Sequence, residues 1–221
     1  MPDTPQDTPT APPPAAGWRA RTPNALTMVR LLLTAVFVAL LSTGNTADQA
    51  VLIAAAGLFV VAAVTDALDG YLARKWNAVS RFGRVMDPFA DKLLVLGAFV
   101  LLAGPAFAGL TEDGERFQSS GVAPWMAVVI LGRELLITSM RGLLESEGID
   151  FSASWSGKIK MIAQSIAIPL ILLLLAFADA GPGSASRGVI LGLAWGVTAL
   201  TAWSALPYVA RARSARRAVA G

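Results

Sequence analysis

One segment of this 221-residue chain, placed between two strongly apolar regions, carries four aspartates: Asp66, Asp69, Asp87 and Asp91. If the first part of this segment is helical, Asp66 and Asp69 share one face with Gly70 and Ala73, because residues three, four and seven positions apart lie on the same side of a helix. Gly70 and Ala73 have little side-chain volume, so a ligand or a neighbouring helix can approach the backbone beside the two acids.

The second pair of aspartates repeats this arrangement after a short connection. Asp87 and Asp91 are four residues apart and share a face if their helix begins before Pro88, which is tolerated in a first turn because the N–H that it lacks has no intrahelical partner there. Carboxylates that converge at the ends of two antiparallel helices repel one another, since like charges are costly at short range in a low dielectric. We therefore expect a cation to neutralise them.

The side chains available favour a hard divalent ion as that cation. The chain contains no His and no Cys, which excludes disulfides, thiolate ligands, a histidine base and a histidine or cysteine nucleophile, and leaves an aspartyl phosphate as the conceivable covalent intermediate. Carboxylate oxygens alone favour Mg²⁺, Mn²⁺ or Ca²⁺ over zinc, and a carboxylate-bridged pair of ions suits phosphate chemistry. With Arg74 and Ser80 nearby to contact phosphate oxygens, the sequence predicts a diphosphate site.

The composition indicates that these acids belong to a membrane protein. Hydrophobic residues make up 55% of the chain, charged residues 15%, and the mean hydropathy is +0.59, as expected when long uncharged runs dominate. Six runs are long enough to span a bilayer, at 24–43, 49–73, 88–109, 122–144, 158–179 and 187–210. The sequence predicts an all-α integral membrane protein with six transmembrane helices in a domain at 18–213, a disordered tail at 1–17 and a basic tail at 214–221.

The basic residues predict the orientation of these helices. If the six spans alternate, most basic residues outside the apolar runs fall on one side, whereas the connections on the other side hold only Arg116 and Arg187. The positive-inside rule then places both termini and the aspartates at the cytoplasmic face of the cell membrane. The first run lacks a convincing cleavage site, so we expect it to be retained. The net charge of +3 is not gathered into an aromatic-interleaved patch, and no nucleic acid partner is expected.

The aspartate segment resembles the signature of the CDP-alcohol phosphatidyltransferase family, D-x2-D-G-x2-A-R-x8-G-x3-D-x3-D. Here the signature falls on Asp66, Asp69, Gly70, Ala73, Arg74, Gly83, Asp87 and Asp91. The resemblance implies a six-helix membrane enzyme, usually a homodimer, in which an alcohol displaces CMP from a CDP-linked lipid. It also implies two ions, Mg²⁺ or Mn²⁺, held by the four aspartates, with Asp91 as the base as well.

The resemblance also implies residues that bind the CDP-lipid. Gly70 and Arg74 would lie at the CDP group, with Gly83 beside them in the signature, and Ser80 fills a position near the nucleotide. Asn24 and Thr27 would contact the cytidine edge. From the residues alone, both are also suited to capping the first helix, and the two roles are compatible.

Three further blocks resemble the phosphatidylglycerophosphate synthase branch of this family: "TPNALTMVRLLL" at 22–33, "GRELLITSMR" at 132–141 and "SWSGKIKMIAQ" at 154–164. The resemblance implies CDP-diacylglycerol and sn-glycerol 3-phosphate as substrates. Met161 departs from it, because this branch commonly has Thr there. Glycerol 3-phosphate is a dianion, so its pocket should supply positive charge, and the candidates are Arg133, Arg141, Lys158 and Lys160.

Other interpretations of these features remain open. Each of these four basic residues is also consistent with a structural role, in which its long side chain extends to the lipid headgroups. For Arg133 an ion pair with Glu134 is a further structural role. Another alcohol, such as inositol phosphate, serine or phosphatidylglycerol, could replace glycerol 3-phosphate. A cation-coupled transporter is the alternative from a different class, although the C-terminal half contains no second copy of the aspartate cluster. The favoured hypothesis is direct attack of the acceptor 1-hydroxyl on the β-phosphorus of CDP-diacylglycerol.

Overall fold

The computed structural model describes residues 18–76, 81–111, 113–146 and 155–210. Over these ranges the chain forms six long helices: α1 (Trp18–Thr43), α2 (Gln49–Lys75), α3 (Arg81–Leu102), α4 (Pro124–Ser146), α5 (Trp155–Phe177) and α6 (Ala185–Trp203). A short helical segment, 206–210, follows α6 after a turn at Ser204 and Ala205. The six helices predicted from the apolar runs are therefore present, and the tails at 1–17 and 214–221 lie outside the described residues.

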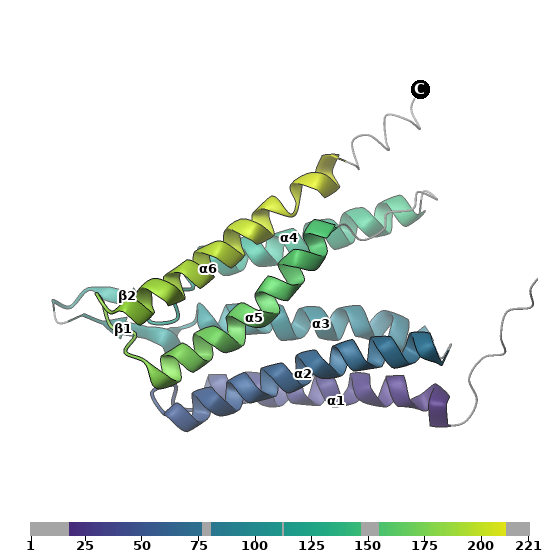
Figure 1. Ribbon diagram of the computed structural model, residues 1–221. Coiled ribbons are helices and arrows are strands. Elements are labelled where there is room, and N and C mark those ends of the chain that lie inside the picture. The colour runs from purple at the N-terminus through teal and green to yellow at the C-terminus, as the bar shows by residue number, and fades with distance from the viewer. Residues whose placement is uncertain (1–17, 77–80, 112, 147–154, 211–221) are drawn as a thin grey trace, which may run out of the picture.

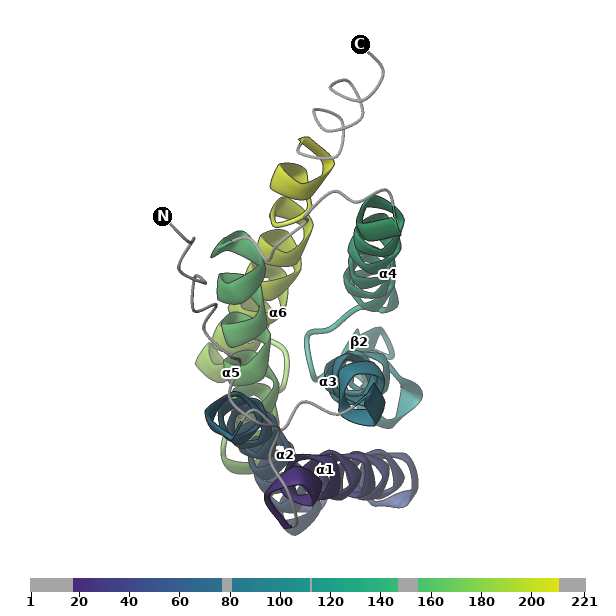
Figure 2. The same cartoon turned by 90° about the vertical axis from the view of Figure 1, so that its right-hand side faces the viewer.

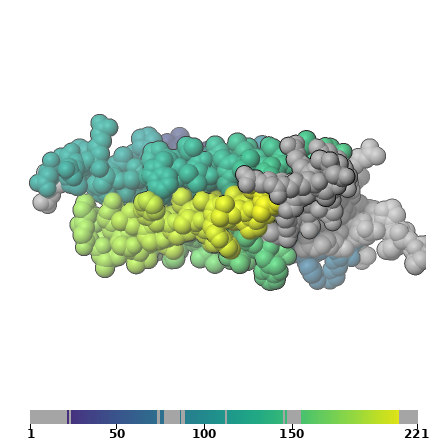
Figure 3. All heavy atoms as spheres, turned by 90° about the horizontal axis from the view of Figure 1, so that it is seen from above, coloured from purple at the N-terminus to yellow at the C-terminus, as the bar shows by residue number. Residues whose placement is uncertain are grey.

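The helices form an elongated bundle in which α1, α2 and α3 lie together and α5 runs obliquely between α2 and α6 (Figure 1). Viewed along the bundle, α1 and α2 lie side by side, and α4 lies beyond α3 (Figure 2). From above, α4 and α6 run next to each other along one face (Figure 3). The end of α2 and the starts of α3 and α5 are directed toward the same end of the bundle, so the segments that carry the predicted site residues lie in the same half of the molecule (Figure 1).

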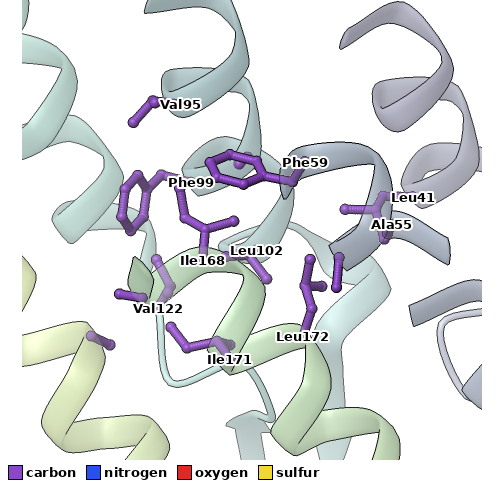
Figure 4. Packing of buried hydrophobic residues seen from close by; sticks show 14 of the residues in the cluster. Leu41, Ala55, Phe59, Val95, Phe99, Leu102, Val122, Ile168, Ile171 and Leu172 are labelled. Carbon is purple, nitrogen blue, oxygen red and sulfur yellow. The ribbon is translucent and has the colours of Figure 1, made fainter. Parts of the chain in front are cut away.

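The interior of the bundle is apolar and lies mainly toward the other end. Phe59 of α2, Phe99 of α3 and Ile168 of α5 are almost completely buried in one cluster (Figure 4). Large apolar side chains also point outward: Leu32 is 65% exposed and Val128 66%. A water-soluble protein keeps such contiguous surface small, whereas a bilayer solvates it. Both the core and the outer surface of the bundle are therefore apolar.

Among the described residues, four helices are long and apolar enough to cross a membrane: Asn24–Thr43, Gln49–Leu72, Trp155–Phe177 and Ala185–Ala210. Helices α3 and α4 have similar lengths but carry more charge. Asp91 and Lys92 lie in α3, and Arg133 and Glu134 lie in α4. These four candidate spans fit a multi-pass membrane protein.

The prediction of an all-α chain is wrong at one point. Between α3 and α4 the chain forms a 3₁₀ turn, η1 (Pro105–Phe107), and an antiparallel pair, β1 (Ala108–Leu110) and β2 (Arg116–Gln118). The predicted helix at 88–109 instead spans Arg81–Leu102 and stops just before Gly104 and Pro105. Proline cannot donate a helical hydrogen bond and disfavours a helical residue before it, which explains the early end. The hairpin turn contains Gly114 at φ +80, a conformation that favours glycine.

Candidate active site

Two aspartates of the signature are bound by an arginine from the first helix. Arg30 of α1 is fully buried; its Nη1 donates to Asp66 Oδ1 and its Nη2 to Asp69 Oδ2 on α2. A planar guanidinium presents two parallel donors and therefore suits a pair of carboxylates one helical turn apart. The Asp66 side chain remains 34% exposed, whereas that of Asp69 is 4% exposed. The expected neutralising cation is thus partly supplied by the chain itself.

The sequence interpretation did not assign Arg30 to the site, although a signal was present. A charged side chain within an apolar run is costly unless it is paired, so Arg30 in "TMVRLLL" indicated an acidic partner. Thr27 and Thr34 lie on the same buried side of α1, and Thr34 Oγ1 donates to the Arg30 carbonyl at 2.8 Å. These two threonines and Arg30 form the buried polar side of α1.

Asp66 and Asp91 line a pocket of about 350 Å³ between α1, α2, α3 and α5. Its polar side chains include Arg30, Asp66 and Asp91, and the rest of its wall is mostly apolar, with Val64 and Ile166 among the lining residues. A pocket with charged groups beside a large apolar wall suits a ligand that has both a charged head and a hydrocarbon part.

Asp91 also lines a second, much smaller crevice between α3, α4 and α5. This crevice is bordered by Glu134, Lys160 and Gln164, and its volume is about 10 Å³. Asp91 therefore lies at the boundary between the pocket that contains Arg30 and Asp66 and the crevice that contains Lys160.

Two of the four predicted acceptor-binding cations meet at one carboxylate. Arg133 Nη1 donates to Glu134 Oε1 at 2.9 Å, and Lys160 Nζ donates to the same oxygen at 2.7 Å. Arg133 Nε donates to Ser204 Oγ at 3.0 Å, and its guanidinium lies 5.4 Å from the Tyr208 ring centroid. The Arg133–Glu134 ion pair considered in the sequence is therefore present, and it also includes Lys160.

The other two cations differ from each other in environment. Arg141 is partly buried on α4, and its Nε is buried with no hydrogen-bond partner among the described residues. Lys158 is exposed near the start of α5, with its Nζ 5.6 Å from the ring centroid of Trp155, a residue that is 79% exposed. This environment fits a side chain that reaches the membrane interface. Arg141 is the better placed of the two to hold a buried anion.

The fit of the acids to a divalent ion rests on their chemistry. Among the side chains that the structure describes, no three acidic groups are close enough to hold a metal ion, and the Asp87 side chain lies outside that set. Asp66 and Asp91 line one pocket, and Asp69 accepts a hydrogen bond from Arg30, as Asp66 does. These hard oxygen donors, without sulfur or imidazole, fit Mg²⁺ or Mn²⁺.

The helix boundaries correct two details of the predicted site. Because α3 begins at Arg81, Asp87 and Asp91 lie on one continuous helix as expected, but Pro88 is well inside it rather than in its first turn. Because α1 begins at Trp18, neither Asn24 nor Thr27 caps it, and that interpretation is wrong. The side chain of Arg74 and the surroundings of Gly83 are not described, and Ser80 lies outside the described residues.

Comparisons with known proteins place the chain in one family. The sequence model of CDP-alcohol phosphatidyltransferase matches residues 20–203. The chain is 36% identical over 160 residues to the CDP-diacylglycerol–glycerol-3-phosphate 3-phosphatidyltransferase of Bacillus subtilis, which covers 68% of this chain and 76% of the relative. It is 35% identical over 189 residues to a probable phosphatidylglycerophosphate synthase of Mycobacterium tuberculosis. This match covers 86% of this chain and 80% of the relative.

A third relative is matched over nearly its whole length. The CDP-diacylglycerol–glycerol-3-phosphate 3-phosphatidyltransferase of Escherichia coli is 34% identical over 194 residues, which cover 87% of this chain and 94% of the relative. The matched region contains all six helices of the bundle except the first residues of α1. The chain belongs to the CDP-alcohol phosphatidyltransferase family.

Proposed function

We propose that this chain transfers the phosphatidyl group of CDP-diacylglycerol to sn-glycerol 3-phosphate, giving phosphatidylglycerophosphate and CMP. The relatives from Bacillus subtilis and Escherichia coli are named for this reaction. The observation that carries the proposal is the position of Asp91, which borders both the pocket with Arg30 and Asp66 and the crevice with Lys160. A base for this reaction must contact an acceptor alcohol beside a bound donor.

The larger pocket is the proposed donor site. Its charged end suits the diphosphate, and its apolar wall suits the first part of the acyl chains. The residues proposed to bind the CDP-lipid are Asn24, Thr27, Gly70, Arg74, Ser80 and Gly83. Two divalent ions, Mg²⁺ or Mn²⁺, would be held by Asp66, Asp69, Asp87 and Asp91, and when bound they would neutralise charge on the diphosphate oxygens and on the departing CMP.

The cations of α4 and α5 are proposed to hold the acceptor phosphate. Arg133 and Lys160 together carry two positive charges against the single carboxylate of Glu134, and Arg141 adds a further guanidinium. This excess of positive charge suits a dianionic phosphate monoester. Lys158, which is exposed, would attract the acceptor at the entrance instead of gripping it.

In the proposed reaction the Asp91 carboxylate accepts the proton of the acceptor 1-hydroxyl. The oxygen that loses this proton forms a bond to the β-phosphorus, and the bond from that phosphorus to the oxygen of the CMP phosphate breaks. CMP leaves with the bonding electrons, and the proton remains on Asp91 until it is released to water. Arg30 keeps Asp66 and Asp69 in place, and the α4 and α5 cations orient the acceptor.

We also propose that all six helices cross the cell membrane, with the aspartate end of the bundle and both termini in the cytoplasm, and that the protein is a homodimer. The excess of basic residues in the connections at the aspartate end supports this orientation. The polar substrates, glycerol 3-phosphate and the cytidine diphosphate group, could then reach Asp91 from the aqueous side while the lipid tails stay in the bilayer.

A direct test is release of CMP by the purified protein in detergent–lipid micelles that contain CDP-diacylglycerol and Mg²⁺ or Mn²⁺. We expect rapid release with glycerol 3-phosphate and little with inositol phosphate, serine or phosphatidylglycerol. Faster release with one of these alcohols would reassign the acceptor. Cation flux across sealed vesicles without any CMP release would instead support a transporter.

A further inference from the structure

Gln164 has a buried oxygen that no group in the described part of the chain satisfies. The residue lies on α5 and is 1% exposed. Its Nε2 donates to Thr201 Oγ1 on α6 at 3.0 Å, whereas its Oε1 is buried and accepts no hydrogen bond from any described residue. Buried side-chain acceptors in folded proteins nearly always have a donor. The Gln164 oxygen therefore indicates a donor that is bound from outside the chain.

This oxygen belongs to a residue of the small crevice beside the proposed base. Gln164 lines that crevice together with Asp91 and Lys160. Lys160 precedes Gln164 by four residues, so both side chains leave the same face of α5. The crevice volume of about 10 Å³ is about that of one water-sized group. The space beside Gln164 therefore fits a single hydroxyl.

The chemistry of the surrounding groups restricts what that donor can be. The Lys160 ammonium donates to Glu134, and the Lys92 ammonium, which also borders the crevice, donates to Thr138 Oγ1. An ionised phosphate or carboxylate has no proton to donate to an amide oxygen, but a hydroxyl has one. A single O–H donor of this size, either a water molecule or an alcohol hydroxyl of a ligand, would therefore satisfy Gln164.

We propose that Gln164 is a specificity-determining residue that accepts a hydrogen bond from the central hydroxyl of the acceptor. This inference rests on the proposed function. Glycerol 3-phosphate has two hydroxyls. The one that reacts must give its proton to Asp91, which leaves the central hydroxyl for Gln164. An acceptor that lacks this hydroxyl leaves the Gln164 oxygen buried without a donor, and the enzyme disfavours it for that reason.

The test compares glycerol 3-phosphate with 3-hydroxypropyl phosphate, which has the same reacting hydroxyl and phosphate but no central hydroxyl. For the unaltered protein we expect kcat/KM to favour glycerol 3-phosphate by on the order of tenfold. In Gln164→Met, which has a similar length but no acceptor oxygen, this ratio should fall to near one, mainly because kcat/KM for glycerol 3-phosphate decreases.

Thr201→Val is the matched control. It removes the same Gln164–Thr201 hydrogen bond but keeps the Gln164 oxygen, so both acceptors should be affected equally and the ratio should stay near that of the unaltered protein. The proposal is overturned if the unaltered protein shows no preference, if Gln164→Met keeps the preference, or if Thr201→Val abolishes it to the same extent. If CMP is released with glycerol 3-phosphate, these results contradict the role of Gln164 but not the proposed function. If no CMP is released with glycerol 3-phosphate, the proposed function itself is contradicted.

Discussion

Lys160 Nζ lies 2.7 Å from Glu134 Oε1, so that a cation of α5 and a carboxylate of α4 form a buried pair beside the crevice that Asp91 lines. The same carboxylate oxygen accepts from Arg133. One negative charge is thus shared by two positive ones. Glu134 holds both cations in place, and it also reduces the charge that they present to an incoming phosphate.

Replacing Glu134 tests both roles separately. Glu134→Gln keeps an oxygen acceptor but removes the negative charge, so we expect the KM for glycerol 3-phosphate to fall about threefold and inhibition by inorganic phosphate to strengthen. Steady-state kinetics for each substrate measure this change. Glu134→Ala removes the acceptor as well, which frees Lys160, and should raise that KM instead. Equal shifts in the KM for CDP-diacylglycerol would contradict a role at the acceptor phosphate.

The two lysines of α5 form a matched pair for the acceptor site. Lys160 is buried and paired with Glu134, whereas Lys158 is exposed beside Trp155. We expect Lys160→Gln to raise the KM for glycerol 3-phosphate by about tenfold or more, because the loss of one charge-assisted hydrogen bond to a phosphate costs about 1.5–3 kcal/mol. Lys158→Gln should change it by about twofold or less, since surface charges are screened. A larger increase in this KM for Lys158→Gln than for Lys160→Gln would indicate that the acceptor phosphate binds at the surface, near Lys158.

Asp91 is expected to be required for turnover and much less for binding of the lipid donor. Asp91→Asn cannot accept a proton from the acceptor hydroxyl, so CMP release should fall by at least about a hundredfold, while binding of CDP-diacylglycerol, measured by titration in micelles, should change much less. Asp113→Asn, in the exposed hairpin turn, is the control and should retain full activity. An Asp91→Asn protein with near-normal turnover would eliminate Asp91 as the base.

Arg30 is expected to stabilise the folded bundle as well as the site. Arg30→Met removes the guanidinium from two carboxylates, one of which is 4% exposed, and removing one member of a buried pair costs about 3–5 kcal/mol. The free energy of unfolding in detergent should fall by about that amount. Arg30→Lys should lose less, because it keeps the charge but not the two parallel donors.

The control for Arg30 is an exposed arginine outside the helix bundle. Arg116 is exposed in the hairpin, and Arg116→Gln should leave the free energy of unfolding within about 0.5 kcal/mol of the original value. If Arg30→Met proved as stable as the original protein, its contacts with Asp66 and Asp69 would not be important for folding.

Much of this architecture could be predicted from the sequence because local patterns determine it. The lengths of the apolar runs predicted the helices, and helical spacing predicted the shared face of Asp66 and Asp69, which both contact Arg30. The partners of Arg30 and Lys160 could not be predicted, because they meet only when the helices pack. The two partners of Arg30 lie 36 and 39 residues away along the chain, and the partner of Lys160 lies 26 residues away. The end of α3 was missed because apolar residues continue past Leu102, although Pro105 marked the limit.

The turn that ends α6 at Ser204 brings the last described residues of the chain against Arg133 of α4. Arg133 receives its contacts with Ser204 and Tyr208 from residues that follow this helix. During synthesis, α4 leaves the ribosome before those residues do. The contact of Arg133 with Glu134, the next residue in the chain, can form before then. The cluster that is proposed to hold the acceptor phosphate is therefore completed last, when the final turns of the chain reach α4.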